Sequence, residues 1–551
     1  MQDRSEASAA DSTMMFVPLS MGQLLDYGAS AFGYQEIVSF DDEGHADRMS
    51  FASFRDRCLR QATHLREAQN VSMGERVATL AWTNRRHLEL YFSVPGLGAV
   101  LHTINPRYSD EQIVYILNHA GNRVALVDPN QQARIEALSS QCPNLEHIIP
   151  LDQDWDAQID ATALLVSWVE VPETSGSSMC YTSGTTGEPK GVVYSHRSTM
   201  LYTLAGLATG KLALGAQATA LMCVPMFHVN GWSKPFQAML SGSKIVLPGS
   251  RMDGDSLLNV IDAERVTCGF GVPTIWLGLV EKMRELGRGA GTLRNIGFGG
   301  GAVPRSLLTA LIDEFGIQPE TGYGMTETTA GLALGSDGPD FEAGDAEKRL
   351  DLYAAQRPIF GLDMKIEDEE GQDCPRDGHS TGELTLKGHL VIGSYFQNSE
   401  ANEASFTSQG RFRTGDIVSI DENGRVRVQD RLKDIIKSGG EWINSAVLER
   451  ECNAHADVVE SAAIGLPHAK WSERPLLVVR KRPGATLSEA DLRAFVKDRV
   501  QSWWCPDAVH LVDELPKTAT GKIDKKILRK QLGGWSFDSS NKLLKPNNET
   551  Q

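Results

Sequence analysis

The sequence predicts an α/β protein with a large, multi-subdomain N-terminal α/β domain and a small, mobile α+β domain at the C-terminus. At 551 residues the chain exceeds the size at which one hydrophobic core stops growing, so two or more domains are expected. In its first part, short apolar runs alternate with stretches of helical spacing, which is typical of parallel strands joined by helices. Helix and strand signals begin again after a break at Gly439-Gly440, which indicates a second, smaller folding unit.

The alternation of helix and strand signals can be followed along the chain. Residues 51–68 have the spacing of an amphipathic helix, 76–81 form a short apolar strand, and a helix is expected from about Asn84. A strand pattern returns at 122–127, and 138–168 alternates loops with short apolar runs. These segments predict the first part of a wound α/β domain.

The middle of the chain continues in the same way, with a helix from about Ser198 and a strand at 218–224. The letters G-D-S-L at 254–257 match the serine attachment site of carrier proteins and a short lipase block. We interpret them as an ordinary helix start capped by Asp253 or Asp255. No carrier-protein attachment site is therefore expected in this segment.

Charge and cysteine usage limit the classes of function. The formal net charge is −17, which disfavours nucleic acid or an anionic membrane as the main partner. The eight cysteines are dispersed without a C-x-x-C pair and predict reduced, mostly buried thiols. Residues 1–13 are polar and predict a disordered start without a signal peptide, and no run of apolar residues is long enough to cross a membrane. A cytoplasmic protein without a transmembrane segment is expected.

A glycine- and hydroxyl-rich segment at 181–191, Y-T-S-G-T-T-G-E-P-K-G, is a candidate phosphate-binding loop. Glycines allow backbone N–H groups to point at an anion, hydroxyl groups add donors, and Lys190 adds a positive charge. The segment lacks the G-x-x-x-x-G-K-[ST] spacing of mononucleotide-binding loops, and a plain surface turn is the alternative. The candidate residues in the loop are Thr182, Ser183, Gly184, Thr185, Thr186, Gly187 and Lys190.

Two further blocks predict a nucleotide site. The first, F-G-G-G-A-V-P at 298–304, has consecutive glycines against which a flat base can lie. In the second, T-G-Y-G-M-T-E at 321–327, Tyr323 offers a stacking face, Thr326 a hydroxyl for the α-phosphate, and Glu327 a carboxylate suited to Mg²⁺. The candidates in these blocks are Gly299, Gly300, Gly301, Ala302, Tyr323, Gly324, Thr326 and Glu327.

Four other segments complete the set of motifs. P-M-F-H-V-N-G-W at 225–232 places a histidine and a tryptophan at the end of a strand, where simple core packing is the alternative. R-F-R-T-G-D at 411–416 ends in an aspartate that could accept from two adjacent hydroxyl groups. D-R-L-K-D at 430–434 precedes K-S-G-G-E-W-I at 437–443, and L-P-K-T-A-T-G-K-I at 515–523 lies just before the last predicted helix.

In their order and separation these blocks resemble the adenylate-forming superfamily, and within it the acyl-CoA synthetases. The resemblance covers 181–523, whereas the first 180 residues agree only in their general α/β pattern. It implies an AMP-binding N-terminal domain at 14–432, a mobile C-terminal domain at 433–535 and a polar tail at 536–551. His389 stands where the family usually has proline, and no function is inferred from it.

The resemblance also implies a role for individual residues. It places His228, Trp232 and Gly299 beside the acyl group, Asp416 and Arg431 at the ribose, and Glu327 at the magnesium ion. It makes Lys433 the hinge between the domains and Lys522 the lysine of the adenylation step. The segment that faces coenzyme A corresponds to Lys437, Ser438, Gly439, Gly440, Glu441 and Trp442.

The implied reaction has two steps: a carboxylate and ATP give acyl-AMP and pyrophosphate, and coenzyme A then gives acyl-CoA and AMP. Medium- and long-chain fatty-acyl-CoA ligases and 3-methylthiopropionate-CoA ligases are the most similar subgroups, and an aryl acid of the cinnamate type is an alternative. ATP, Mg²⁺ and coenzyme A are the expected small-molecule partners, and a homodimer is compatible with the family.

Three alternatives belong to other classes. A luciferase-like oxygenase would share the adenylation half but oxidise its product in the absence of coenzyme A. A catalytically silent nucleotide-binding regulator is disfavoured because Glu327, Asp416, Arg431 and Lys522 are all present. A peptide-synthetase adenylation unit is disfavoured because no carrier domain is encoded.

Overall fold

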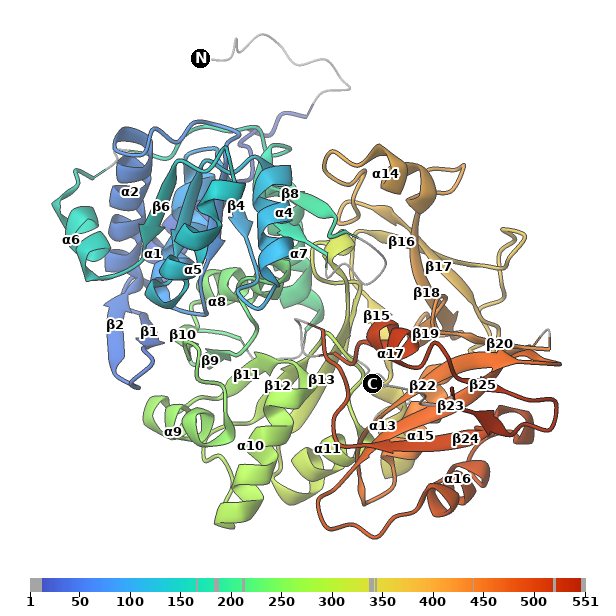
Figure 1. Cartoon of the computed structure of the whole chain (residues 1–551). Helices are drawn as coiled ribbons and strands as arrows, with labels where there is room; N and C mark the ends of the chain where they lie inside the picture. Colours follow the sequence, from blue (N-terminus) through green and yellow to red (C-terminus); the bar gives the residue numbers. More distant parts are fainter. Residues whose placement is uncertain are drawn as a thin grey trace.

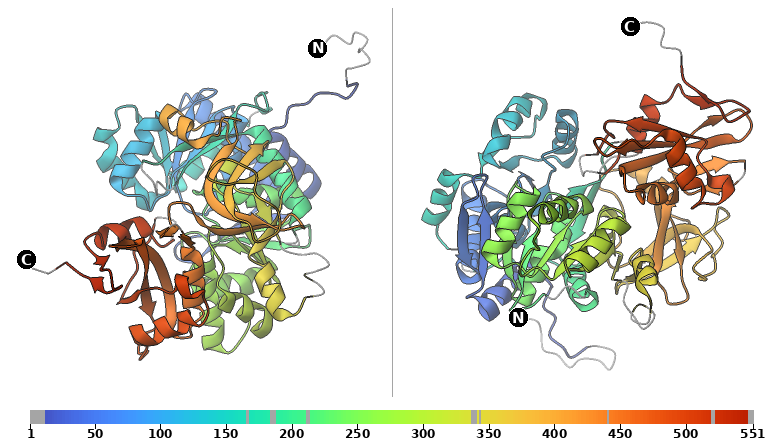
Figure 2. Two further views of the ribbon diagram at one scale, coloured as in Figure 1. Left: turned by 90° about the vertical axis from the view of Figure 1, so that its right-hand side faces the viewer. Right: turned by 90° about the horizontal axis from the view of Figure 1, so that it is seen from below.

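The computed structural model describes residues 12–164, 167–182, 188–210, 214–335, 341, 344–439, 441–518 and 522–546. It confirms the predicted class: a large N-terminal α/β domain, blue to light orange in Figure 1, lies beside a smaller C-terminal α+β domain in deeper orange and red. Figure 2 shows the small domain against one side of the large one. The predicted disordered start falls mostly outside the described residues.

The first subdomain is a six-stranded sheet in the order β6-β5-β3-β4-β7-β8, with all neighbours parallel except β7 and β8. Its strands are β3 (Arg76–Leu80), β4 (Val100–Thr103), β5 (Val124–Val127), β6 (His147–Pro150), β7 (Gly176–Tyr181) and β8 (Gly191–Ser195). The helices of this region are α2 (Phe51–Glu67), α3 (Arg85–Gly96), α4 (Asp110–Ala120), α5 (Pro129–Leu138) and α6 (Gln153–Ala161). Strands β3 and β5 are almost fully buried, as expected where helices cover a parallel sheet.

A second, 13-stranded sheet runs through the rest of the large domain in the order β16-β17-β18-β19-β15-β14-β13-β12-β11-β9-β10-β1-β2. From β1 through β10, β9, β11 and β12 to β13 the neighbours are parallel, and from β13 to β16 they are antiparallel. The parallel part comprises β1 (Glu36–Phe40), β9 (Thr219–Met222), β10 (Lys244–Leu247), β11 (Cys268–Gly271), β12 (Asn295–Phe298) and β13 (Gln318–Tyr323). The remaining strands are β2 (Ala46–Ser50), β14 (Ala333–Leu334), β15 (Ala355–Pro358), β16 (Leu362–Glu367), β17 (Gly382–Gly388), β18 (Phe412–Ile420) and β19 (Val426–Arg431).

The helices associated with this sheet include those that carry the predicted motifs. They are α1 (Met21–Phe32), α7 (His196–Thr209), α8 (Lys234–Ser241), α9 (Gly254–Glu264), α10 (Pro273–Leu286), α11 (Arg305–Thr309), α13 (Ala346–Leu352) and α14 (Ser399–Ser405), with short turns η2 (Val229–Ser233), η3 (Ala310–Glu314) and η4 (Thr326–Thr328). Asp253 caps α9 by accepting a hydrogen bond from the Ser256 N–H at 2.9 Å. The G-D-S-L segment is therefore the helix start that the sequence predicted.

The C-terminal domain has a sheet in the order β21-β20-β23-β22-β25-β26, with β24 beside β23. Its elements are β20 (Ile436–Ser438), β21 (Glu441–Ile443), α15 (Ser445–Asn453), β22 (Val458–His468), β23 (Ser472–Lys481), α16 (Glu489–Lys497), η5 (Ser502–Trp504), β24 (Ala508–Val512), α17 (Lys525–Gln531), β25 (Ser536–Phe537) and β26 (Leu543–Leu544). Two apolar clusters pack around the long strands β22 and β23. Strand β25 pairs with β22, so part of the polar segment after residue 535 belongs to this sheet, which the sequence did not predict.

Contacts at the predicted hinge join the two domains. Asp430, at the end of β19, accepts hydrogen bonds from the backbone N–H and hydroxyl of Ser445 at 2.6 and 2.7 Å, and so caps the start of α15. Within the small domain, next to the hinge, Arg529 of α17 pairs with Asp434 at 2.7 Å. All eight cysteines are free thiols, as predicted, and seven are buried. Within the described residues no helix is long and apolar enough to cross a membrane.

Candidate active site

A cavity of about 540 Å³ lies where the carboxyl ends of β12 and β13 meet β18, β19 and the segment before α17. Fourteen of the predicted site residues line it, although they come from distant parts of the chain. They are Thr182, Lys190, His228, Trp232, Gly299, Gly300, Tyr323, Gly324, Thr326, Glu327, Asp416, Arg431, Lys433 and Lys522. The position fits the rule that ligands of open α/β sheets bind outside the carboxyl ends of the strands.

The other predicted site residues are not at this cavity or are not described. Gly301 and Ala302 follow β12 but do not line the cavity, and neither do Lys437, Ser438, Gly439 and Trp442 of the C-terminal domain. Ser183, Gly184, Thr185, Thr186, Gly187 and Gly440 lie outside the described residues, as does the side chain of Glu441.

The base of the predicted phosphate loop is closed by two hydrogen bonds. The Thr182 N–H donates to the Lys190 carbonyl at 2.9 Å, and the Lys190 N–H donates to Thr182 Oγ1 at 3.1 Å. Thr182 follows β7 and Lys190 precedes β8, and these two strands pair in antiparallel fashion. Lys190 Nζ lies 4.9 Å from the ring centroid of Tyr395, on the cavity wall. Lys190 thus presents a positive charge to the cavity.

Asp416 is held by residues from two other strands. The Tyr323 phenol donates to Asp416 Oδ2 at 2.6 Å, and Arg431 Nε lies 3.3 Å from Asp416 Oδ1. The antiparallel register of β18 and β19 sets Asp416 directly opposite Arg431. Burial and the neighbouring Asp416 charge raise the pKa of Tyr323, so its phenol stays protonated and remains a donor. The aspartate is therefore fixed at the cavity wall.

Glu327 lies in η4, directly after the G-Y-G block, and its carboxylate lines the cavity. Tyr395 donates a hydrogen bond to Glu327 Oε1 at 2.8 Å. Burial raises the pKa of Glu327, although the Tyr395 hydrogen bond opposes this shift. A cation beside the carboxylate would offset the cost of burying its charge.

Trp232 is placed by an unusual backbone turn. Val229, Asn230, Trp232 and Ser233 all have positive φ values between 38° and 54°, in a region that non-glycine residues rarely adopt. The turn lays the indole over Gly299, so closely that a β-carbon on this glycine would lie 2.8 Å from the ring. His228 precedes the turn, and burial together with the positive charge of Lys522 lowers its pKa to about 4. It is therefore neutral near pH 7.

Lys522 lines the cavity from the C-terminal domain, directly before Ile523. Lys517 and Ile523 form a β-bridge, and the Thr518 N–H donates to the Lys522 carbonyl at 2.7 Å. Lys522 retains accessible surface and lines the cavity, so its ammonium group can meet a small ligand there. The surrounding protein desolvates the group and lowers its pKa to about 8, and the positive charge of Arg431 adds to this shift. Three cations, Arg431, Lys433 and Lys522, thus share one wall, and an anion would relieve their repulsion.

Comparison with known proteins agrees with this geometry. The family model "AMP-binding enzyme" matches residues 28–396, and "AMP-binding enzyme C-terminal domain" matches 448–522. The chain belongs to the AMP-binding enzyme family. A long-chain-fatty-acid–CoA ligase of Thermus thermophilus is 42% identical to this AMP-binding enzyme over 529 residues, covering 95% of this chain and 97% of the relative. A 3-methylmercaptopropionyl-CoA ligase of Ruegeria pomeroyi is 40% identical, covering 94% of this chain and 98% of the relative.

Solved structures have the same fold. The o-succinylbenzoate CoA synthetase of Bacillus subtilis, in complex with its acyl-adenylate intermediate, superposes on this AMP-binding enzyme with a TM-score of 0.79 at 26% identity. The alignment covers 94% of this chain and 99% of that one. The shared fold includes both domains.

Sequence reasoning missed five charged residues of the AMP-binding enzyme's cavity: Glu188, Lys234, Glu320, Glu383 and Arg413. Lys234, the first residue of α8, and Glu320, on β13, both line the cavity and are buried. Each lies within two residues of a predicted motif, Lys234 after Trp232 and Glu320 before Gly322. Their closeness to the motifs was the available signal, but the sequence does not reveal that they are buried.

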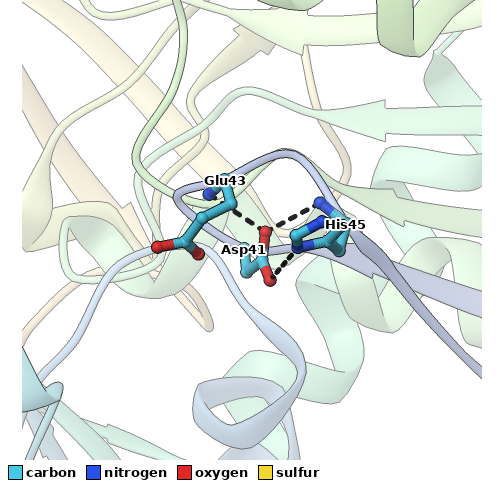
Figure 3. Close-up of side chains that lie close together, drawn as sticks. All are labelled: Asp41, Glu43 and His45. Carbon is cyan, nitrogen blue, oxygen red and sulfur yellow. Dashed lines mark hydrogen bonds and ion pairs between the residues drawn. The ribbon is translucent and has the colours of Figure 1, made fainter.

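A cluster of Asp41, Glu43 and His45 lies away from the cavity, in the turn between β1 and β2 (Figure 3). Asp41 Oδ1 accepts from the Glu43 and His45 N–H groups at 3.0 and 2.7 Å, and Asp41 Oδ2 lies 3.2 Å from His45 Nδ1. All three residues are exposed, and these hydrogen bonds account for the arrangement as a turn in which the aspartate binds backbone N–H groups.

Proposed function

We propose that this AMP-binding enzyme is an ATP-dependent acyl-CoA ligase that activates a medium- or long-chain fatty acid through an acyl-adenylate. The observation that supports this most is the position of Lys522. It comes from the C-terminal domain, yet it lines the same cavity as Glu327, Asp416 and Trp232 of the large domain. This arrangement suits the first half-reaction, in which a carboxylate oxygen attacks the α-phosphorus of ATP and pyrophosphate leaves.

The residues of the cavity divide naturally between the parts of ATP. The Tyr323 ring and the glycine backbone at Gly300 suit the adenine, and Asp416 suits the two ribose hydroxyls because its two oxygens can accept from adjacent donors. Thr326 and Lys522 suit the α-phosphate. Lys190 suits the β- and γ-phosphates that leave as pyrophosphate.

Lys522 would act by electrostatics. The attacking carboxylate and the α-phosphate are both anions, and a preorganised ammonium group lowers the free energy of the charge that develops as they approach. Removing one such contact costs on the order of 10²–10³ in rate. The neighbouring Arg431 and Lys433 increase the positive potential at the same wall.

Magnesium fits Glu327. The carboxylate faces the cavity, one of its oxygens accepts from Tyr395, and burial disfavours its charged form, which a divalent cation would restore. When bound, the ion would neutralise phosphate charge. The hydrogen bond from Tyr395 orients the carboxylate for that purpose.

The second half-reaction requires a different arrangement of the domains. Thiolate attack by coenzyme A on the acyl-adenylate gives acyl-CoA and AMP. Lys437, Ser438, Gly439 and Trp442 do not line the cavity here, so we propose that the small domain turns about Lys433 to bring this segment to it. The same rotation would withdraw Lys522 once the adenylate has formed.

A panel of acids tests the proposal. Propionate, 3-methylthiopropionate, octanoate, palmitate and cinnamate are each incubated with ATP, Mg²⁺ and coenzyme A, and AMP release is measured. We expect AMP with at least one monocarboxylic acid and exchange of labelled pyrophosphate into ATP only when that acid is present. Intact ATP, or ADP alone, with every acid would refute the proposal.

The Lys522→Ala variant separates the two half-reactions. Pyrophosphate exchange should fall by about 10²–10³, whereas thioester formation from pre-made acyl-AMP should continue. Equal loss in both steps would contradict the role given to Lys522. Lys526→Ala, on the neighbouring helix α17 but outside the cavity, is the matched control.

A further inference from the structure

Lys234 is a buried cation in the wall of the cavity. The residue is 6% exposed, and its ammonium group donates to Gln237 Oε1 at 2.8 Å. The ammonium nitrogen also lies 4.8 Å from the ring centroid of Phe270. In the described part of the chain no carboxylate lies within ion-pair distance of it.

The position of Lys234 is unfavourable for a positive charge. Lys234 is the first residue of α8, where the free N–H groups of the helix already give a partial positive charge. Burial lowers the pKa of Lys234. A buried ammonium group with one amide acceptor and one aromatic ring has donors to spare, and burial of such a group is costly without further acceptors. A ligand that supplies an acceptor would offset that cost.

Glu320 supplies the opposite charge in the same cavity. It lies on β13, is 7% exposed, and lines the cavity together with Lys234, Trp232 and Phe270. Its negative charge acts on Lys234 and partly opposes the lowering of the lysine pKa. A carboxylate can accept from several donors at once, so Glu320 can bind a ligand hydroxyl in addition to its protein partners.

The two charged groups lie on the acyl side of the cavity. Lys234 follows the turn that lays Trp232 over Gly299, and Phe270 and Tyr202 contribute the neighbouring apolar wall. An unbranched alkyl chain would bring no further acceptor to the Lys234 ammonium group. A second carboxylate on the ligand would attract Lys234 but repel Glu320. A hydroxyl group is compatible with both charges, because its oxygen can accept from an ammonium group and its proton can be donated to a carboxylate.

We propose that Lys234 and Glu320 select an acid whose acyl chain carries a hydroxyl group, so that the preferred substrate is a hydroxy fatty acid. This inference rests on the acyl-CoA ligase function proposed above. It names a chemical class within the fatty acids and assigns two residues to its recognition.

The substrate preference of the unaltered enzyme is the first test. Each even-numbered straight-chain acid from butanoate to palmitate is compared with its ω-hydroxy acid and its dicarboxylic acid by coenzyme A-dependent AMP release. We expect at least one hydroxy acid to exceed both its parent and its dicarboxylic counterpart in kcat/KM by about tenfold or more, as hydrogen bonds to buried charged groups allow. If the alkyl acids react and no hydroxy acid is better, the inference fails while the ligase function stands. If no acid reacts, the ligase function itself fails.

Variants of the two residues provide the second test. Lys234→Met keeps most of the length of the side chain without its charge. It should reduce the kcat/KM advantage of the hydroxy acid over the alkyl acid to less than about twofold, and kcat/KM for alkyl acids should rise. Glu320→Gln removes the repulsion between this side chain and the second carboxylate of a dicarboxylic acid. The variant should therefore increase kcat/KM for the dicarboxylic acid relative to the hydroxy acid. Lys387→Met, at an exposed lysine on β17 outside the cavity, should leave both ratios unchanged. If folded Lys234→Met keeps the hydroxy-to-alkyl ratio of kcat/KM unchanged, the role assigned to Lys234 is overturned. If that variant does not fold, the kcat/KM ratios of the unaltered enzyme and of Glu320→Gln decide whether the proposal holds.

Discussion

The phenol of Tyr323 donates a hydrogen bond to Oδ2 of Asp416 across 2.6 Å, and so joins β13 to β18 at the edge of the cavity. One residue belongs to the parallel part of the large sheet and the other to its antiparallel part. The bond fixes the carboxylate that we propose as the ribose ligand. Removing this hydrogen bond should therefore weaken nucleotide binding more than acid binding.

Tyr323→Phe keeps the aromatic ring and removes this donor. We expect KM for ATP to rise by roughly tenfold, because a hydrogen bond to a charged group contributes about 1.5 kcal/mol or more. KM for the acid should change much less. Tyr34→Phe makes the same change at a tyrosine that is exposed and lies outside the cavity, so it serves as the control. Equal changes in both KM values would contradict the proposed division of the cavity.

Glu327→Gln tests the magnesium site. The amide is a weaker ligand for a hard cation, so the variant should need more Mg²⁺ to reach half of its maximal rate of pyrophosphate exchange. Tyr395→Phe leaves the carboxylate but removes its orienting hydrogen bond, and should weaken the apparent affinity for Mg²⁺ by about 10- to 100-fold. Both effects are measured by titrating the metal at fixed ATP. Unchanged titration curves in both variants would place the ion elsewhere.

The pH dependence of adenylation should report Lys522. Its pKa is lowered to about 8, so the charged form predominates below that value and is lost as the pH rises through it. The kcat/KM for ATP, which reflects the free enzyme, should therefore fall above about pH 8. His228, with a pKa of about 4, stays neutral from near-neutral pH upward and contributes nothing to this fall. In Lys522→Arg the residual activity should show no such decline, because a guanidinium group keeps its charge.

Gly299→Ala should narrow the acyl side of the cavity. A β-carbon there would lie 2.8 to 3.2 Å from the Trp232 ring, so the indole has to shift. We expect kcat/KM for acids to fall by about tenfold or more, as overpacking of one to a few kcal/mol implies, while KM for ATP changes little. Gly301→Ala is a matched control, since no described atom lies within 4 Å of its β-carbon. Similar losses in both variants would mean that the effect does not come from Trp232.

Much of the site could be predicted because its glycines and polar residues occur in blocks that follow strands. The G-Y-G block continues β13, and the R-T-G-D block lies on β18, so the predicted residues of each block reach the cavity together. Helix and strand predictions in the first domain were also close, with α2 at Phe51–Glu67 against the predicted 51–68. The sheet that brings distant blocks together could be inferred only from the family resemblance.

Other features depend on tertiary structure and were not predictable. Lys234 and Glu320 are residue types usually found at the surface, and their burial follows from the packing of α8 and β13. Lys437 and Trp442 belong to the small domain and lie outside the cavity, and the position of one domain against another cannot be read from one sequence. The strand pairing of Phe537 with His468 likewise joins a short, polar segment to a long strand that offers it an edge.

The large sheet continues without interruption from β2 to β16 and includes both Tyr323 and Asp416, whereas Lys522 comes from a separate domain. The groups proposed to hold the nucleoside therefore belong to one continuous sheet. The lysine proposed to promote adenylation belongs to the other domain. AMP bound to the residues of the large sheet would therefore remain bound while the small domain rotates. If the small domain is replaced by that of a relative, the rate of thioester formation should therefore change. Nucleoside recognition should stay that of the protein that supplies the large domain.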